Sequence, residues 1–519
     1  MQQNNFQVDG SAALEMEDVI FRFYENGKKN ILDHASLTVR EGTLTVLMGS
    51  SGCGKSTLAA VAAGLYPENG GFLLQGSIRL FGRDLKELNP RTRAEYLSVM
   101  FQNPDLQFCM ATPEKELYFC MENMAVPPEE MKQRVTDTAA RFGLESFLTR
   151  PLHTLSGGEK QMVSLACLYV VGSRMIILDE AFANIDGEAA KKIFTLLMKM
   201  KEQGSTILAI DHRLDLWLEA ADEIVILTDG AKVLERGLNR ENLEEAREVF
   251  RQEGLFFPGE AGKKYNNVKE TEEGGQYGES TTCKEENLPA VSFDAVTIFS
   301  EVQKRFGREI PSGKTLVENT SFDIPAGTIT ALLGSSGSGK TTSFLALMKK
   351  HPYTGTIRMF GEDIRKKKPE ELYRNAGFVF QNPANQFVTQ KVEDEVTCGL
   401  RIWNPEWTDE DIQREAERLL TAFGLESKRR LSPYMLSQGQ QRRLAVLSAL
   451  SGGQKLLLLD EPTYGQDDRS TEGIMRELLK KKEADGLTVV MITHDRELAE
   501  RFADRILVLE DRKIRERGM

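Results

Sequence analysis

Short runs of mainly apolar residues recur along the chain, each bounded by polar residues or glycine. Runs of this kind fit strands that are buried on both faces. Six of them are predicted strands, at 44–48, 175–178, 206–210, 329–333, 455–459 and 488–492. Because helical segments separate these runs, the pattern predicts an α/β fold.

Some of the longer segments carry apolar residues at helical spacing. In one of them the apolar positions follow i, i+4, i+7, i+8 and i+11, which lie on a single helix face. The residues of this stripe and of a shorter one in the first half are Ile412, Ala416, Leu419, Leu420 and Phe423, and Met131, Val135, Ala139 and Phe142. We expect both stripes to pack into a hydrophobic core.

The same ordered set of short motifs occurs twice in the chain. Five pairs of matching residues are separated by 279 to 285 positions. Five matches in one order indicate the duplication of a whole domain. Between the copies lies a segment rich in Gly, Glu, Lys, Thr and Asn, a composition typical of a flexible linker. We predict one domain at 12–245, an acidic linker at 246–290 and a second domain at 291–519.

The composition narrows the class of protein. A net charge of −12 argues against nucleic acid as the main partner, because phosphate backbones are bound by fields of Lys and Arg. The six cysteines are scattered, so we expect no disulfide framework or zinc site and a reducing compartment. We also expect no secretory signal, and no apolar run approaches the ~20 residues that span a bilayer.

Two glycine-rich loops, at 49–56 and 334–341, fit the pattern G-x-x-x-x-G-K-[ST]. Glycines let such a loop point its backbone N–H groups at phosphate oxygens, and the following helix presents its positive N-terminal end. We therefore predict two ATP sites, with Mg²⁺ bound beside the phosphates. The predicted binding residues are Gly49, Ser50, Ser51, Gly52, Gly54, Lys55, Ser56 and Thr57, and Gly334, Ser335, Ser336, Gly337, Gly339, Lys340, Thr341 and Thr342.

Within these sets, Lys55 and Lys340 are expected to reach the β- and γ-phosphates, and Ser56 and Thr341 to ligate Mg²⁺. A purely structural glycine-rich turn is the alternative. The preceding buried strand and the second copy disfavour it.

An Asp-Glu pair closes one predicted strand in each half. An unpaired carboxylate at the end of an apolar strand would be costly, so we assign Asp179 and Asp460 to Mg²⁺. Glu180 and Glu461 come next, where a carboxylate can orient and polarise the attacking water. The alternative, a carboxylate that caps a turn, explains the repeated spacing less well.

Two further polar residues recur near the predicted phosphate sites. His212 and His494 follow apolar strands, 33 and 34 residues after the two aspartates, and we expect them to contact the γ-phosphate. Gln102 and Gln381 precede an Asn-Pro turn and can bind the Mg²⁺ shell. A structural histidine and simple turn chemistry are the respective alternatives.

The motifs Leu155–Glu159 and Leu436–Gln440 are more specific to one protein family than the phosphate loops are. Each places a serine 23 residues before the strand-end aspartate, and together with the phosphate loops they resemble the ATP-binding-cassette (ABC) superfamily. The resemblance implies two tandem P-loop domains, each with a mixed sheet flanked by helices plus a helical subdomain.

The same resemblance implies that the two domains pair head to tail within the molecule and share the nucleotides. The loop at Lys55 would then be completed by Ser437 and Gly439. The loop at Lys340 would be completed by Ser156 and Gly158. ATP would join the halves, and hydrolysis would let them part.

Several residues depart from the usual pattern of that family. Gln438 stands where Gly is usual, Glu159 stands where Gln is common, and the segment 181–186 lacks the commoner Pro-Thr start. Both halves keep the lysine, the glutamate and the histidine, so we expect two hydrolysis-competent sites, whose rates need not be equal. The adenine-stacking aromatic of the first domain is predicted as Phe23, with Tyr24 as the alternative. In the second domain Phe299 and Phe306 both compete.

The stretches 102–108 and 381–387 share the pattern Gln-Asn-Pro-x-x-Gln-Phe. They resemble the ATPase components of energy-coupling-factor importers of vitamins and transition-metal ions. This resemblance implies a transmembrane partner bound near Gln102 and Gln381, a substrate-capturing membrane subunit, and a location at the cytoplasmic face of the membrane.

Three other functions compete with transport. A tandem cassette protein that acts on the ribosome would usually carry a basic, helical linker, whereas this linker is acidic. A DNA-repair cassette ATPase would carry zinc-binding Cys pairs, which are missing from the sequence. A scaffold that binds ATP without turnover would not need the catalytic residues that both halves keep.

Overall fold

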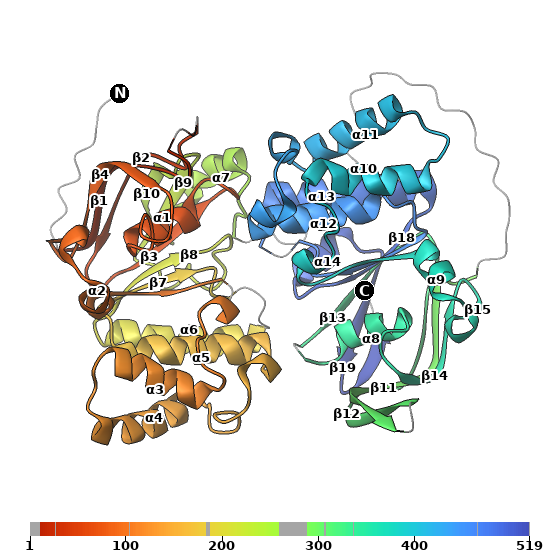
Figure 1. Cartoon of the computed structure of the whole chain (residues 1–519), viewed down its shortest axis with the longest axis horizontal. Helices are drawn as coiled ribbons and strands as arrows, with labels where there is room; N and C mark the ends of the chain where they lie inside the picture. Colours follow the sequence, from red (N-terminus) through yellow and green to blue (C-terminus); the bar gives the residue numbers. More distant parts are fainter. Residues whose placement is uncertain are drawn as a thin grey trace. The chain divides into compact units, whose positions relative to one another are not determined.

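The computed structural model of the chain describes residues 11–25, 27, 29–102, 104–182, 187–258, 288–305, 308–335, 337–463 and 465–517, with the backbone alone at 106, 302–305 and 308–311. These residues form two compact units that divide near residue 259 (Figure 1). Each unit has its own pair of sheets and its own hydrophobic core.

The main sheet of the first unit has the order β10-β9-β3-β8-β7-β6. Its strands are β3 (Leu44–Gly49), β6 (Leu97–Met100), β7 (Met175–Asp179), β8 (Thr206–Ile210), β9 (Glu223–Thr228) and β10 (Lys232–Leu238). All neighbours pair in parallel except β9 and β10, so the sheet is mixed, as the family resemblance implies. The parallel order brings the carboxyl ends of β3, β7 and β8 to one edge.

A second, antiparallel sheet of the first unit has the order β2-β1-β4-β5. It consists of β1 (Ala12–Arg22), β2 (Leu32–Arg40), β4 (Phe72–Leu80) and β5 (Arg83–Asp84). Together with α1 (Lys55–Ala62) it covers one face of the main sheet. The central strands β3, β7 and β8 are buried along their whole length, because the other face is covered as well.

Helices cover that other face. They are α3 (Pro113–Asn123), α4 (Pro128–Phe142), α5 (Gly157–Val171) and α6 (Gly187–Glu202), while α2 (Pro90–Tyr96) precedes β6. Their buried residues form one cluster with alternate residues of the strands, such as Val46, Leu178 and Ala209. The predicted stripe on α4 lies in this core, since its four residues are all buried.

The second unit repeats this architecture, with a main sheet in the order β16-β17-β18-β13-β19-β20. Its strands are β13 (Ile329–Gly334), β16 (Ala376–Val379), β17 (Leu456–Asp460), β18 (Thr488–Ile492), β19 (Arg505–Glu510) and β20 (Lys513–Glu516). The antiparallel sheet consists of β11 (Val291–Arg305), β12 (Arg308–Ile324), β14 (Tyr353–Met359) and β15 (Glu362–Asp363).

The helices of the second unit are α8 (Lys340–Leu347), α9 (Pro369–Asn375), α10 (Val392–Trp403), α11 (Asp409–Ala422), α12 (Gln438–Leu450), α13 (Asp468–Asp485) and α14 (Arg496–Phe502). The stripe on α11 is buried, as predicted. All six predicted strands are present, and the α/β fold with duplicated domains is confirmed.

One short helix, α7 (Arg247–Glu253), lies inside the range that the sequence assigns to the linker. Phe250 and Leu255 are buried in the core of the first unit. The unit therefore continues past residue 245, because these apolar side chains gain more by packing than a solvated linker would allow. Within the described ranges, the structure has no helix long and apolar enough to cross a membrane.

Candidate functional site

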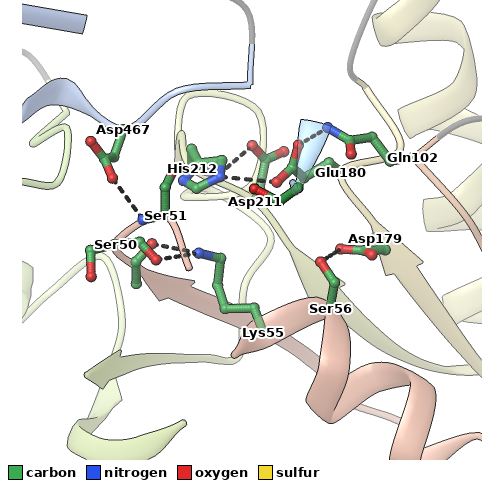
Figure 2. Close-up of polar contacts among 12 residues, drawn as sticks. Ser50, Ser51, Lys55, Ser56, Gln102, Asp179, Glu180, Asp211, His212 and Asp467 are labelled. Carbon is green, nitrogen blue, oxygen red and sulfur yellow. Dashed lines mark hydrogen bonds and ion pairs between the residues drawn. The ribbon is translucent and has the colours of Figure 1, made fainter. Parts of the chain in front are cut away.

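The first phosphate loop connects β3 to α1. Gly54 caps the helix with a φ of +113°, and a Cβ at this position would lie 3.0 Å from the carbonyl oxygen of Ile31. Only glycine accepts this conformation without strain. The ammonium of Lys55 is buried and donates to the carbonyl oxygens of Gly49, at 2.6 Å, and Ser50, at 3.0 Å (Figure 2). These carbonyls hold the cation where a phosphate could replace them.

The second phosphate loop has the same geometry between β13 and α8. Gly339 has a φ of +111°, and Lys340 donates to the carbonyl oxygens of Gly334, at 2.8 Å, and Ser335, at 2.7 Å. Thr57 and Thr342 lie in the first turns of the following helices. Of the predicted loop residues, Ser336 lies outside the described residues.

Each loop places a hydroxyl beside the strand-end aspartate. Ser56 donates to Asp179 at 3.0 Å (Figure 2). In the second unit, Thr341 donates to Asp460 at 2.8 Å. Burial, followed by the charge of Glu180, raises the pKa of Asp179 to about 7. Burial likewise raises the pKa of Asp460.

A cation would relieve the cost of burying these carboxylates, and a hydroxyl beside a carboxylate offers the hard oxygen ligands that Mg²⁺ prefers. The described residues contain no cluster of three or more His, Cys, Asp and Glu that could hold a metal alone. Two oxygens from the protein fit a magnesium ion that takes its other ligands from phosphate and water.

Glu180 lies directly after β7, in the left-handed region with a φ of +50°. Such backbone is costly for a residue with a Cβ and is concentrated at functional sites. Its N–H donates to the carbonyl of Ile210 at 2.9 Å, which ties it to the end of β8. One carboxylate oxygen lies 2.9 Å from Nε2 of His212, and the other accepts from the amide of Gln102 (Figure 2).

This surrounding keeps Glu180 ionised. Burial would raise its pKa, but the charge and the hydrogen bond of His212, with the charge of Lys55, lower it below the usual value. An ionised glutamate beside a histidine and a glutamine can accept a proton from a water.

Glu461 has the same backbone conformation, with a φ of +55° and a hydrogen bond of 3.0 Å to the carbonyl of Ile492. Its carboxylate lies 3.4 Å from Nε2 of His494, longer than a normal hydrogen bond. Burial, followed by the charge of Asp460, raises the pKa of Glu461 to about 8. The two glutamates therefore share a backbone conformation but differ in the groups that surround their side chains.

The two glutamines also differ. The side chain of Gln102 reaches Glu180, whereas the side chain of Gln381 is exposed. The buried guanidinium of Arg442 donates instead to the carbonyl of Gln381, at 2.7 Å, and to the carbonyl of Glu461. Arg442 matches Gln161 in the first unit, whose amide donates to the carbonyl of Gln102 at 3.4 Å.

Sequence analysis did not single out Arg442. The sequence feature that could have pointed to Arg442 is its position: it is a charged residue within the buried face of α12, a helix whose other buried residues are mostly apolar. A buried charge needs partners, which points to a structural or catalytic role.

The serine motifs begin α5 and α12. Ser156 and Ser437 are the N-caps, and each accepts from the N–H three residues later at 3.3 Å. Glu159 and Gln440 complete capping boxes by accepting from the serine N–H groups, at 2.7 and 3.1 Å. Glu159 thus serves the same local purpose as the commoner Gln. Gly158 and Gly439 lie in the first turns of these helices.

The predicted adenine-stacking residue Phe23 follows β1. The residue is 41% exposed, and its ring lies 5.4 Å from the ring of Tyr66, edge to face. An exposed ring held by an aromatic neighbour offers a stacking surface. Tyr24 is more exposed, Phe299 lies in β11, and Phe306 lies outside the described residues.

This chain is similar to known proteins in sequence and in fold. The model of the family described as "ABC transporter" matches residues 32–183 and 317–464. The "Putative HMP/thiamine import ATP-binding protein YkoD" of Bacillus subtilis is 34% identical over 518 residues, which cover 96% of this chain and 90% of the relative. The "Putative ABC transporter ATP-binding protein SSO1893" of Saccharolobus solfataricus is 30% identical over 516 residues, covering 96% and 93%.

A solved structure described as "Model of ribosome-bound archaeal Pelota and ABCE1" has a TM-score of 0.64 and covers 96% of this chain and 78% of that chain. Its sequence identity is 18%, so the likeness concerns the fold alone.

Proposed function

Because the chain belongs to the ABC transporter family as an ATPase with two nucleotide-binding units, we propose that it hydrolyses ATP with Mg²⁺ in both units and thereby powers import through a separate membrane protein. One observation carries the proposal most directly. In both units a phosphate-loop hydroxyl bonds the strand-end aspartate, and the following glutamate faces a histidine.

The proposed roles follow from position. Lys55 and Lys340 bind the β- and γ-phosphates, and the hydroxyl–aspartate pairs hold Mg²⁺ beside them. Mg²⁺ would neutralise charge on the phosphates. Glu180 and Glu461 accept a proton from the attacking water.

His212 and His494 lie within reach of these glutamates and would contact the γ-phosphate. Gln102 and Gln381 would join the Mg²⁺ shell.

We further propose that the units pair head to tail, so that each ATP is bound by one phosphate loop and one serine motif. Ser156 and Ser437 suit this role, because their oxygens accept the capping bond while their O–H groups stay available to donate to a phosphate. The positive ends of α5 and α12 would add to the attraction.

The import proposal rests on the Bacillus relative, whose name refers to import of HMP and thiamine. We propose a substrate of the vitamin or metal-ion class, bound by a substrate-capturing membrane subunit. A transmembrane subunit would bind near Gln102 and Gln381, at the cytoplasmic face of the membrane. The fold likeness to a ribosome-bound protein gives the ribosome alternative no functional support, because it concerns the fold alone.

The test is co-expression with the multi-span membrane proteins encoded beside this gene. Co-purification, and uptake by vesicles that stops in the Glu180→Gln, Glu461→Gln chain, would support transport. An ATPase that never associates with membrane proteins but sediments with ribosomes in a salt-sensitive manner would favour the ribosome alternative.

A further inference from the structure

The segment that follows β8 differs between the two units in a way that the roles proposed above do not use. In the first unit it reads Asp211-His212, and in the second Thr493-His494. Asp211 is a partly buried carboxylate beside His212 (Figure 2). A buried carboxylate is costly unless several donors satisfy it.

Three donors from its own segment satisfy Asp211. One carboxylate oxygen accepts from the backbone N–H of His212, at 2.7 Å, and from that of Arg213, at 3.1 Å. The other accepts from the indole Nε1 of Trp217, at 2.8 Å. The carboxylate thus joins the backbone of the histidine to a tryptophan six residues after Asp211.

Trp217 is itself held firmly. Its side chain is fully buried, and its ring packs 4.8 Å from Phe182 and 5.7 Å from Phe194, between centroids. Phe182 lies two residues after Glu180. The same indole therefore contacts the segment that carries the glutamate and, through Asp211, the segment that carries the histidine.

The histidine ring needs such support. Its Nε2 lies 2.9 Å from Glu180, but its buried Nδ1 has no hydrogen-bond partner among the described residues. A catalytic histidine is commonly oriented through its second ring nitrogen. Here the orientation must come from the backbone, which Asp211 holds.

The second unit has none of these groups at the matching positions. Thr493 replaces Asp211 and accepts from the N–H of Asp495 at 3.1 Å, and Ala499 replaces Trp217. Thr463 and Met475 replace the two phenylalanines. The distance from histidine Nε2 to the glutamate is 3.4 Å in this unit, against 2.9 Å in the first.

We propose that Asp211 and Trp217 are positioning residues that hold His212 against Glu180, and that they make the first unit the better organised hydrolytic centre. This inference rests on the proposed ATPase roles of Glu180 and His212. Neither residue needs to touch nucleotide. Their effect passes through the histidine backbone and through the packing of Phe182.

The experiment uses the full chain in two backgrounds. In Glu461→Gln, turnover reports the first unit; in Glu180→Gln, it reports the second. Asp211→Asn keeps an oxygen for the two backbone N–H groups but sets an amide N–H against the indole N–H. Trp217→Phe keeps the ring packing and removes the indole donor. Phe194→Leu is the matched control, since it disturbs the same aromatic cluster without touching Asp211.

We expect Asp211→Asn and Trp217→Phe each to lower kcat about tenfold in the Glu461→Gln background, with KM for ATP unchanged within about twofold. The double variant should be no slower than either single variant, because both break one interaction. In the Glu180→Gln background neither change should alter kcat. An equal loss in both backgrounds, or an equal loss with Phe194→Leu, would assign the pair a purely structural role.

A second measurement does not depend on turnover. The chain has five histidines, so the ¹³Cε1–¹H signals of labelled histidine can be followed one by one, with His212 assigned from His212→Asn. Trp217→Phe should move the His212 signal and leave that of His494 in place. An unmoved His212 signal would overturn the positioning role. If the Glu180→Gln, Glu461→Gln double variant leaves turnover intact, the proposed function fails instead, and the two failures are therefore distinct.

Discussion

The two catalytic glutamates offer the sharpest test, because they share one backbone conformation but have opposite pKa shifts. Glu180→Gln and Glu461→Gln each remove the charge while conserving shape. Loss of a general base costs roughly 10²- to 10⁴-fold in rate, which corresponds to about 3–5 kcal/mol in the barrier. Each single variant should therefore leave turnover to the other unit.

The pH dependence of the remaining turnover follows from the surroundings of each glutamate. In Glu461→Gln, the working base is Glu180, whose pKa lies below its usual value, so turnover should vary little above neutral pH. In Glu180→Gln, the working base is Glu461, with a pKa of about 8. The base must be deprotonated to act, so turnover should rise as the pH increases through this pKa.

The magnitude of that rise can be worked out. A group with a pKa one unit above the pH is about one-tenth ionised, and at its pKa it is half ionised. Turnover of Glu180→Gln should therefore increase about fivefold between roughly pH 7 and pH 8. Mg²⁺ at Asp460 would weaken the repulsion that contributes to this pKa, so the observed midpoint is expected at or somewhat below it.

The assay is phosphate release at saturating ATP and Mg²⁺ across this pH range, with radiolabelled ATP retention for the double variant. The double variant should bind ATP and retain it unhydrolysed. A flat profile for Glu180→Gln, or a steeper one for Glu461→Gln, would refute the reasoning from burial. Undiminished hydrolysis by the double variant would show that neither glutamate is the base.

Three further changes probe the loops and the core. Lys340→Ala removes the ammonium that the second loop holds, and should abolish ATP binding at that site and sharply reduce turnover. Equilibrium ATP binding and phosphate release measure the two effects, and unchanged values would contradict the assigned site. Gly54→Ala places a Cβ at a φ of +113°; it should lower the free energy of unfolding by about 1–3 kcal/mol, measured by thermal unfolding, and weaken ATP binding. The control Gly143→Ala, at a φ of +66° in open space, should lower the free energy of unfolding by about 1–2 kcal/mol and leave ATP binding unchanged. Val490→Ile adds a methyl group to a small apolar cavity in the second core and should raise stability by up to about 0.8 kcal/mol; a lower melting temperature would mean that the cavity cannot accept it.

Local patterns were enough to predict the elements and the candidate groups. The period of the apolar residues predicted the strands and the stripes of α4 and α11, because burial of one face or both faces depends on spacing along the chain. The phosphate loops were equally clear in the sequence. Their backbone adopts positive φ values that demand glycine at particular spacings, as at Gly54 and Gly339. Repetition of these patterns identified the duplicated fold.

Tertiary structure alone decided how the two sites differ. The motifs predicted a glutamate and a histidine in each half, but the left-handed backbone of Glu180 and Glu461 depends on bonds to the ends of neighbouring strands. Arg442 in one unit joins the segments of Gln381 and Glu461, and the packing of Trp217 on Phe182 in the other joins the segments of His212 and Glu180. Only the sheet order brings these segments together. Sequence spacing determines which face of its own element a residue occupies, whereas packing determines which distant residue it meets and therefore how strongly its charge is held.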